Sequence, residues 1–241
     1  MQVIILCAGM GTRLFPISNF LPKSLIPVGN KPCIRWIVDR IKSQGFDDLS
    51  LRVNAKDAPL FEHEFRDVPV KLSYGIAPLG TAGELLAMYE EGEITGSEFI
   101  VYYGDELTQI DLKKLVRFHE SFRHPCVTLA LVHGMRLDVG TVSIDDEGTV
   151  LSFEEKPPLD KAIWSGICVI TKKIFKDGWM QANTDLAADI FPKMLQKQRL
   201  QKQQLIKGAI LSTEWLDIGT ISHWERANKL ALEGKLECGS P

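Results

Sequence analysis

Cysteine motifs, long apolar runs and a large excess of charge of one sign are all missing from this sequence of 241 residues. Its five cysteines are scattered and include no Cys-x-x-Cys pair, which argues against a disulfide framework or structural zinc and favours a reducing cytoplasm. No apolar stretch approaches the ~20 residues that span a bilayer, and no charged leader opens the chain, so we expect no membrane partner. A net charge of −3 offers no overall field for nucleic acid, so any anion site must be built locally.

Apolar runs alternate with amphipathic segments along the first half of the chain. Buried strands are expected at 3–6, 49–53 and 99–103, and helices at 83–91, from Asp111 onward, and over the face formed by Ile34, Ile37, Val38 and Ile41, which Gly45 would end. This rhythm predicts an α/β fold with a mostly parallel sheet covered by helices on both faces. Ligands on such sheets bind beyond the carboxyl ends of the strands.

The second half has a different texture, with shorter β segments after Cys126. Strands are expected at 142–144 and 150–153, on either side of the turn at 145–148, and a further strand at 166–170. No repeat or Pro/Ser-rich linker divides the chain. We therefore expect one domain over 1–241, whose second half completes the pocket.

The stretch from Cys7 to Pro32, directly after the first strand, has the composition of an anion-binding loop. It fits neither the P-loop spacing nor the dinucleotide fingerprint, which would place Gly where Leu14 stands. Glycines at 9 and 11 allow main-chain N–H groups to approach an anion, Arg13 adds a planar fork of donors, and Lys23 adds a point charge behind a proline. Together these groups indicate a phosphate site.

These residues resemble the signature of sugar-1-phosphate nucleotidyltransferases, and in look they are closest to mannose-1-phosphate guanylyltransferases and related heptose enzymes. The matching stretches are Gly9-Met10-Gly11-Thr12-Arg13-Leu14, Pro22-Lys23-Ser24-Leu25-Ile26-Pro27-Val28, Pro78-Leu79-Gly80-Thr81-Ala82-Gly83, Tyr103-Gly104-Asp105, Glu155-Lys156-Pro157, Ser165-Gly166-Ile167 and Trp215-Leu216-Asp217-Ile218-Gly219-Thr220. The resemblance implies a Rossmann-like fold of the nucleotide-diphospho-sugar transferase type. It also implies an enzyme that joins an NTP to a sugar 1-phosphate and releases pyrophosphate.

The resemblance assigns about 1–125 to a nucleotide-binding half and about 126–241 to a sugar-phosphate-binding half. It implies NTP contacts from Leu6, Ala8, Gly9, Met10, Gly11, Thr12, Arg13, Gly80, Thr81 and Gly83, and substrate contacts from Gly140, Glu155, Lys156 and Gly166. Only 21 residues follow Thr220, so we expect no C-terminal β-helix, and a monomer or small homo-oligomer.

Three residues are expected to carry catalysis: Arg13 against the β- and γ-phosphates, Lys23 near the α-phosphate, and Asp105 as a metal ligand. Asp105 follows a buried strand and a glycine, so it lies at the edge of the sheet where ligands bind. With Asp217 it would supply two oxygen ligands for Mg²⁺, which prefers carboxylates together with phosphate oxygens. The sugar phosphate is itself the nucleophile, so the reaction needs positioning and charge neutralisation more than a base.

Other interpretations stay open at this point. Asp217 could simply cap the helix that follows it, Asp105 could lie in a surface turn, and Lys156 could be an ordinary surface lysine. The stretch Cys7-Ala8-Gly9-Met10-Gly11 is also close to cytidylyltransferases that act on choline phosphate or similar small phosphates, and Glu106 places a second acid beside the metal position. A catalytically inactive nucleotide-sugar sensor is a further alternative, although none of the expected charged residues is missing.

Overall fold

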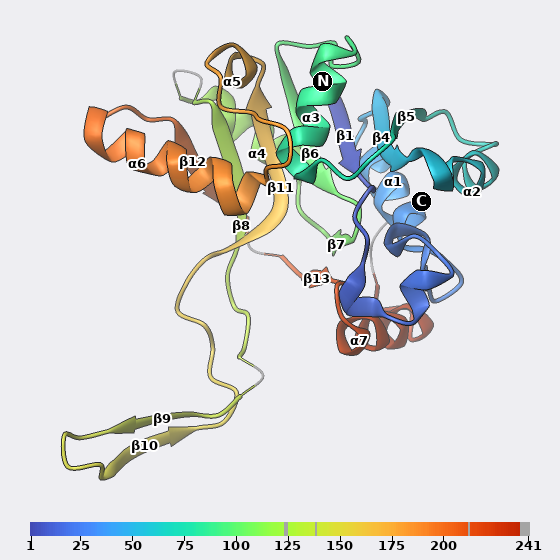
Figure 1. Cartoon of the computed structure of the whole chain (residues 1–241). Helices are drawn as coiled ribbons and strands as arrows, with labels where there is room; N and C mark the ends of the chain where they lie inside the picture. The colour runs from blue at the N-terminus through green and yellow to red at the C-terminus, as the bar shows by residue number, and fades with distance from the viewer. Residues whose placement is uncertain (123–124, 138, 212, 237–241) are drawn as a thin grey trace.

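The computed structural model describes residues 1–122, 125–137, 139–211 and 213–236. A seven-stranded sheet in the order β12-β8-β11-β6-β1-β4-β5 forms its centre (Figure 1). The strands are β1 (Gln2–Leu6), β4 (Leu49–Asn54), β5 (Lys71–Gly75), β6 (Glu98–Tyr103), β8 (Val127–Val132), β11 (Ile163–Thr171) and β12 (Ile206–Ile210). Only β11 runs antiparallel to its neighbours, so the predicted mixed, mostly parallel sheet is confirmed.

Helices cover both faces of this sheet. They are α1 (Cys33–Ser43), α2 (Ala58–Glu64), α3 (Gly80–Glu90), α4 (Leu112–Glu120), α5 (Lys173–Lys176), α6 (Phe191–Gln201) and α7 (Ile221–Leu232). Strand β1 shows why two layers are needed: Val3 and Ile5 belong to one buried cluster, with α1 and α4, whereas Ile4 belongs to the other, with α3 and α6. Successive strand residues point to opposite faces, so a strand that is apolar throughout requires cover on both.

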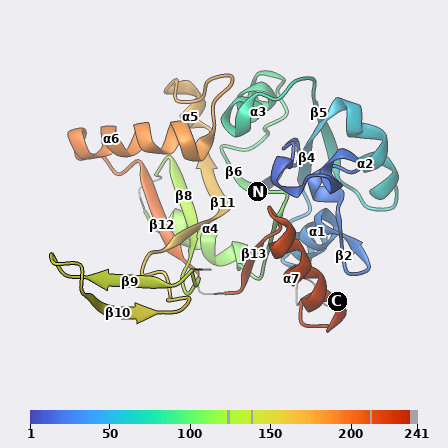
Figure 2. The ribbon, with the colours of Figure 1, turned by 60° about the horizontal axis from the view of Figure 1, so that its bottom comes forward.

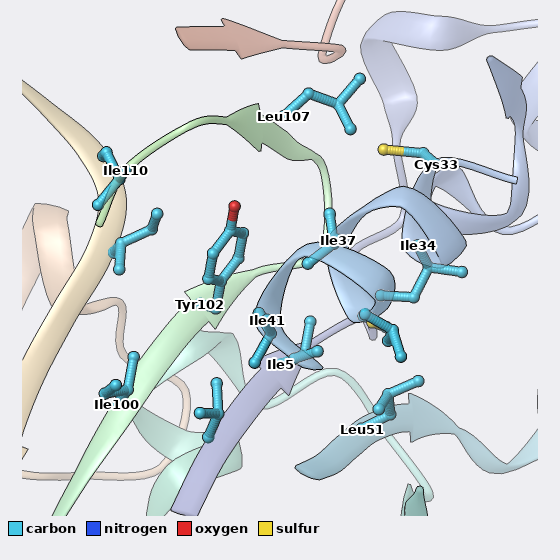
Figure 3. Packing of buried hydrophobic residues seen from close by; sticks show 14 of the residues in the cluster. Ile5, Cys33, Ile34, Ile37, Ile41, Leu51, Ile100, Tyr102, Leu107 and Ile110 are labelled. Atoms are coloured by element: carbon cyan, nitrogen blue, oxygen red, sulfur yellow. The ribbon is translucent and has the colours of Figure 1, made fainter. Parts of the chain in front are cut away.

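The apolar residues that recur along helix α1 pack against the sheet. Its four predicted core positions, Ile34, Ile37, Val38 and Ile41, are all at most 1% exposed and face the sheet, as Figure 3 shows for three of them. Each such side chain contributes about 1.5–3 kcal/mol by leaving water. The helix ends just before Gly45, where a stop was predicted and where φ is +82°.

Two strand pairings place the residues of the site together. Leu6 of β1 lies beside Tyr103 of β6 in parallel register, so the loop after Leu6 and the Gly104-Asp105 turn leave the sheet at the same carboxyl edge. A smaller two-stranded sheet pairs β7 (Glu106–Thr108) with β13 (Trp215–Asp217) and puts Asp217 opposite Glu106. Residues more than 100 positions apart therefore converge on one spot.

The predicted strands around the turn at 145–148 exist as β9 (Thr141–Ile144) and β10 (Val150–Glu154), an antiparallel pair that stands away from the sheet (Figure 1). The pair β2 (Pro27–Val28) and β3 (Lys31–Pro32) completes the strands. Four cysteines, at 7, 33, 126 and 168, are free and buried. Within the described part of the chain, no helix has the length and apolar character needed to cross a membrane.

Candidate active site

A cavity of about 370 Å³ opens at the carboxyl ends of β1 and β6 and is called here the nucleotide cavity. Of the residues expected to contact the NTP, it is lined by Leu6, Ala8, Gly9, Met10, Gly11, Thr12, Arg13, Gly80 and Thr81, and also by Lys23 and Asp105. Gly83 is the exception among those expected contacts, because it is buried in the first turn of α3 against the chain at 182–183. The loop from the first half of the chain thus forms one wall, as expected for a phosphate site.

Backbone geometry and a hydrogen bond fix the first part of this loop, from Ala8 to Leu14. Gly11 adopts φ +61° directly before the 3-10 helix Thr12–Leu14, a conformation that favours glycine. Asn54 at the end of β4 donates a 3.0 Å hydrogen bond to the carbonyl of Ala8, which ties the loop to the sheet. Arg13 remains 66% exposed and available to a ligand.

Lys23 lies between the two predicted metal ligands. Its ammonium forms a hydrogen-bonded ion pair with Asp105 and lies 3.6 Å from Asp217 Oδ1, while Arg13 Nη2 lies 3.9 Å from Asp217 Oδ2. Gly219 leaves room for this arrangement, since a Cβ there would come within 2.8 Å of both the Asp217 carboxylate and Arg13 Nη2. The ammonium of Lys23 thus lies between the carboxylates of Asp105 and Asp217, and this position suits a cation.

Glu106 adds a third carboxylate to this cluster. One oxygen from each of Asp105, Glu106 and Asp217 lies within 4.8 Å of the others. Burial raises the pKa of Glu106 well above its usual value, and the nearby charges of Asp105 and Asp217 raise it further, while Lys23 opposes them. Among the described residues, neither Glu106 Oε2 nor Asp217 Oδ1 has a hydrogen-bond partner, so both buried oxygens are available to a cation.

The far end of the nucleotide cavity contains Asp185, which the sequence did not single out. It precedes the short π-helix η5 (Leu186–Ile190) and lines the cavity beside Gly80 and Thr81. Thr81 holds it in place, because both its main-chain N–H and its hydroxyl donate to Asp185 Oδ1, at 3.2 and 2.9 Å. A fixed carboxylate therefore lies beside Gly80 and Thr81, two of the residues expected to contact the NTP.

A second cavity, of about 420 Å³, lies on the other side of Asp217 and is called here the substrate cavity. Its charged and ionisable lining residues are His133, Arg136, Lys156, Asp217, His223 and Arg226. Cationic and imidazole groups predominate, which suits a phosphorylated ligand. Of these, only Lys156 and Asp217 were expected from the sequence, because the others belong to segments that meet only in the folded chain.

The remaining expected substrate residues lie outside both cavities. Gly140 and Glu155 face each other at the root of the β9–β10 pair, where a Cβ on Gly140 would lie 3.0 Å from Glu155 Oε2. Gly166 lies in β11 with φ +74°, and a Cβ there would come 2.9 Å from Cγ of Glu106. The lack of a side chain at Gly166 therefore leaves room for Glu106 in the carboxylate cluster.

The structure also bears on the capping interpretation of Asp217. Thr220, not Asp217, caps α7, since its side-chain oxygen accepts a hydrogen bond from the main-chain N–H of His223. The carbonyl of Asp217 contacts His223 Nδ1 at 3.0 Å, which leaves the carboxylate for Lys23, Arg13 and the cluster. Asp111 is the aspartate that caps a helix, namely α4.

Comparisons with known proteins agree with this geometry. The model of the nucleotidyl transferase family matches residues 2–234. A D-glycero-alpha-D-manno-heptose 1-phosphate guanylyltransferase of Campylobacter jejuni is 34% identical over 91% of this chain and 95% of its own length. A mannose-1-phosphate guanylyltransferase of Mycobacterium tuberculosis is 29% identical over 97% of this chain, which spans 65% of that protein.

Solved structures give the same picture. HddC from Yersinia pseudotuberculosis complexed with GMP-PN aligns with a TM-score of 0.70 and 25% identity, over 95% of this chain and 98% of that one. Among sequence relatives, a UTP–glucose-1-phosphate uridylyltransferase from Synechocystis is also similar, at 28% identity over 93% of this chain and 62% of its own length. Proteins named as guanylyltransferases and as a uridylyltransferase are thus both similar to this chain.

Proposed function

This chain belongs to the nucleotidyl transferase family, and from that premise we propose that it transfers guanylyl groups with the help of Mg²⁺. It is a sugar-1-phosphate nucleotidyltransferase, an enzyme that joins an NTP and a sugar 1-phosphate into a nucleotide-sugar and releases pyrophosphate. The observation that carries the proposal is the meeting of Lys23, Asp105 and Asp217 between the two cavities. A reacting α-phosphate at that point would have the nucleoside on one side and the sugar on the other.

The two halves of the chain line different cavities. Except for Asp185 and Gly219, the nucleotide cavity is lined by residues 6–105, whereas the substrate cavity is lined by residues 132–226. This supports one domain over 1–241, with a nucleotide half at about 1–125 and a sugar-phosphate half at about 126–241. Free buried thiols at 7, 33, 126 and 168 suit a reducing compartment such as the cytoplasm.

The carboxylate cluster fits Mg²⁺, which binds oxygen ligands and commonly shares them with substrate phosphates. Asp105 and Asp217 would hold it, and the buried Asp217 Oδ1, which accepts no hydrogen bond in the described part of the chain, supports that assignment. Bound Mg²⁺ would neutralise charge on the phosphates during transfer. The ammonium of Lys23 offsets part of the negative charge of the two carboxylates.

The chemistry requires one bond to form and one to break. An ionised oxygen of the sugar phosphate attacks the α-phosphorus in line, and the bond from that phosphorus to the bridging oxygen breaks as pyrophosphate leaves. Arg13 and Lys23, which line the nucleotide cavity, would offset the negative charge of the NTP, and Lys156, which lines the substrate cavity, would offset that of the sugar phosphate. Catalysis then comes from positioning two polyanions that would otherwise repel each other.

Asp185 supports guanine as the base. The Watson–Crick edge of guanine presents two neighbouring N–H donors, and a carboxylate can accept both. Adenine, cytosine and uracil do not offer that pair of donors. The main chain at 78–80 would pack against the base, because Pro78, Leu79 and Gly80 line the wall of the nucleotide cavity.

A substrate panel tests the proposal directly. We would incubate the purified chain with GTP, CTP, UTP, dTTP or ATP and with mannose, manno-heptose or glucose 1-phosphate, with Mg²⁺ or with a chelator, and measure pyrophosphate and nucleotide-sugar. We expect turnover with GTP and Mg²⁺ and little with the chelator. A preference for CTP with choline phosphate would favour the cytidylyltransferase alternative, and NTP binding without turnover would favour a sensor.

A further inference from the structure

Strand β4 contains a buried arginine in the middle of the central sheet. Arg52 is 2% exposed, and register places it between Leu6 of β1 and Ser73 of β5, on the face where α3 packs (Figures 1 and 2). Burying a guanidinium is costly unless its N–H groups are paired. Arg52 lines neither the nucleotide cavity nor the substrate cavity, so its burial requires a reason other than direct contact with a ligand.

Two glutamates and a serine accept hydrogen bonds from this guanidinium. Arg52 Nε donates to Glu84 Oε2 at 2.8 Å. Arg52 Nη1 donates to Glu91 Oε2 at 2.8 Å and to Ser73 Oγ at 2.7 Å. Burial lowers the pKa of Arg52, but the hydrogen bonds and charges of Glu84 and Glu91 outweigh it and raise that pKa above its usual value. The sheet therefore presents a fixed positive charge to α3.

Glu84 is the buried partner in this network. Its side chain is 6% exposed, whereas that of Glu91 is 48% exposed. Gly75 on β5 leaves room for it, because a Cβ there would lie 2.9 Å from Glu84 Oε2. A carboxylate buried in this way depends on its cation, since loss of the partner would leave an uncompensated charge in the interior.

The second oxygen of Glu84 connects the arginine to the wall of the nucleotide cavity. Oε1 accepts a hydrogen bond from the main-chain N–H of Leu79 at 3.3 Å. Leu79 is the N-cap of α3 and lines the cavity together with Pro78 and Gly80. In a capping box, a glutamate in the first helical turn reaches back to the N-cap N–H, and Glu84 does the same from the second turn. Arg52 thus holds the carboxylate that fixes the start of α3.

The other side of this segment is held by the chain at 184–185. The main-chain N–H groups of Ala82 and Gly83 donate to the carbonyl of Thr184 at 3.0 and 3.3 Å, and that of Thr81 donates to Asp185 Oδ1. The segment therefore lies between two sets of contacts. Those from 184–185 come from the far end of the nucleotide cavity, whereas the contact through Glu84 joins the segment to the central sheet.

We propose that Arg52 is a positioning residue for NTP binding, which acts through Glu84 to fix the main chain at 78–80 against the nucleoside. A segment that is already ordered binds its ligand without the entropic cost of ordering. Neither residue belongs to the stretches that resemble nucleotidyltransferases, since the stretch in this region ends at Gly83. The inference rests on NTP binding in the nucleotide cavity, as in the proposed function, but on neither guanine nor Mg²⁺.

Two substitutions test the two ends of this contact. Arg52→Met keeps the length of the side chain but removes its charge and donors, so Glu84 loses the partner that holds it against Leu79. Glu84→Gln puts an NH₂ group where one of the two oxygens accepts, so the bond to Arg52 or the bond to Leu79 is lost. Each variant should raise Kd and KM for the NTP about 10-fold, the size of one lost hydrogen bond, and leave KM for the sugar phosphate unchanged.

Glu91→Gln is the matched control. Glu91 contacts the same guanidinium from an exposed position, and in the described part of the chain no hydrogen bond joins its side chain to 78–80, so both KM values should stay as in the wild type. The double variant of Arg52→Met with Glu84→Gln should bind NTP no more weakly than the weaker single variant, because both act through one contact. A purely structural role gives a different result: partial unfolding lowers kcat and leaves both KM values unchanged.

Calorimetric titration with GTP in the absence of sugar phosphate measures Kd, and steady-state kinetics with each substrate varied measures KM. Thermal unfolding first identifies a temperature at which the variants are folded; if Arg52→Met does not fold, Glu84→Gln decides, because it preserves the shape of the side chain. An unchanged Kd for the NTP in Glu84→Gln, or equal rises in both KM values, would overturn the inference. A wild type that binds GTP without turnover would contradict the proposed function alone, and the Kd values would still test Arg52.

Discussion

The hydroxyl of Thr81 donates a 2.9 Å hydrogen bond to Asp185 Oδ1, across 104 residues of sequence. The same hydroxyl oxygen accepts from the main-chain N–H of Leu186 at 2.9 Å. The proton of this hydroxyl is therefore engaged in holding Asp185, and in the proposed function it is the carboxylate that contacts the base. Thr81 was expected to contact the NTP, and that role stays a prediction.

Replacing Asp185 tests the base assignment. Asp185→Asn keeps the shape but puts an amide donor where guanine presents donors, so kcat/KM for GTP should fall by about 10- to 100-fold, the size of one or two lost hydrogen bonds. The ranking of the five NTPs should change with it. Asp177→Asn, at an exposed position just after α5, is the matched control. An unchanged ranking would show that Asp185 does not contact the base.

Metal ligation predicts a different pattern at Asp105 and Asp217. Replacing either by Asn removes the charge that would hold Mg²⁺, and turnover should drop about 100-fold or more while thermal unfolding of the metal-free protein changes little. Mn²⁺ titration should show weaker binding independently of activity. Asp111→Ala should behave in the opposite way, because this residue caps α4: about 1 kcal/mol less unfolding free energy and near-normal turnover. Normal turnover in Asp217→Asn would remove it from the site.

Much of this arrangement could be predicted from sequence and some could not, for a physical reason. Strands such as Val3–Leu6 and the face of α1 follow from local periodicity, and Asp105 follows from its position after a strand. Pairing between distant strands leaves no local signal: nothing near Ile167 indicates that it pairs with Tyr102. The antiparallel placement of β11 between β8 and β6 was therefore not foreseen.

The same limit explains the missed site residues. Asp185 and Arg226 are single polar residues without a motif, and only folding brings them to a cavity wall. Helix α6 was not predicted, because the chain after Cys126 was interpreted as short β segments, and no bounds were predicted for strand β8. Glu106 was noted as a second acid, yet its burial depends on Gly166, 60 residues further along.

The two cavities predict separable kinetic defects. Lys156→Ala should mainly raise KM for the sugar phosphate, by about 30-fold if a charge-assisted contact of about 2 kcal/mol is lost, whereas Arg13→Ala should impair NTP use and slow turnover. Steady-state kinetics with each substrate varied in turn measures both. Lys229→Ala, at an exposed position on α7, should change neither constant. Equal defects for both substrates in Lys156→Ala and Arg13→Ala would contradict the assignment.

Glu106 predicts how the stability of the metal-free protein depends on pH. Its pKa in the folded protein lies well above 4.5, chiefly because of burial and then because of Asp105 and Asp217. The folded state therefore holds this proton more tightly than the unfolded chain does. The associated stability is fully present below pH 4.5 and is lost as the pH rises through the raised pKa, with a slope of at most about 1.4 kcal/mol per pH unit.

Urea unfolding with a chelator between pH 4.5 and 8 measures this loss, and Glu106→Gln should flatten the curve because an amide does not ionise. The flattening should come from higher stability at the upper end of the range, where wild-type Glu106 must carry a charge beside two other carboxylates. Glu225→Gln on the exposed side of α7 is the control and should follow the wild type. If Glu106→Gln and the wild type give parallel curves, Glu106 is ionised in the folded protein throughout this range, and the Lys23 ammonium outweighs its burial.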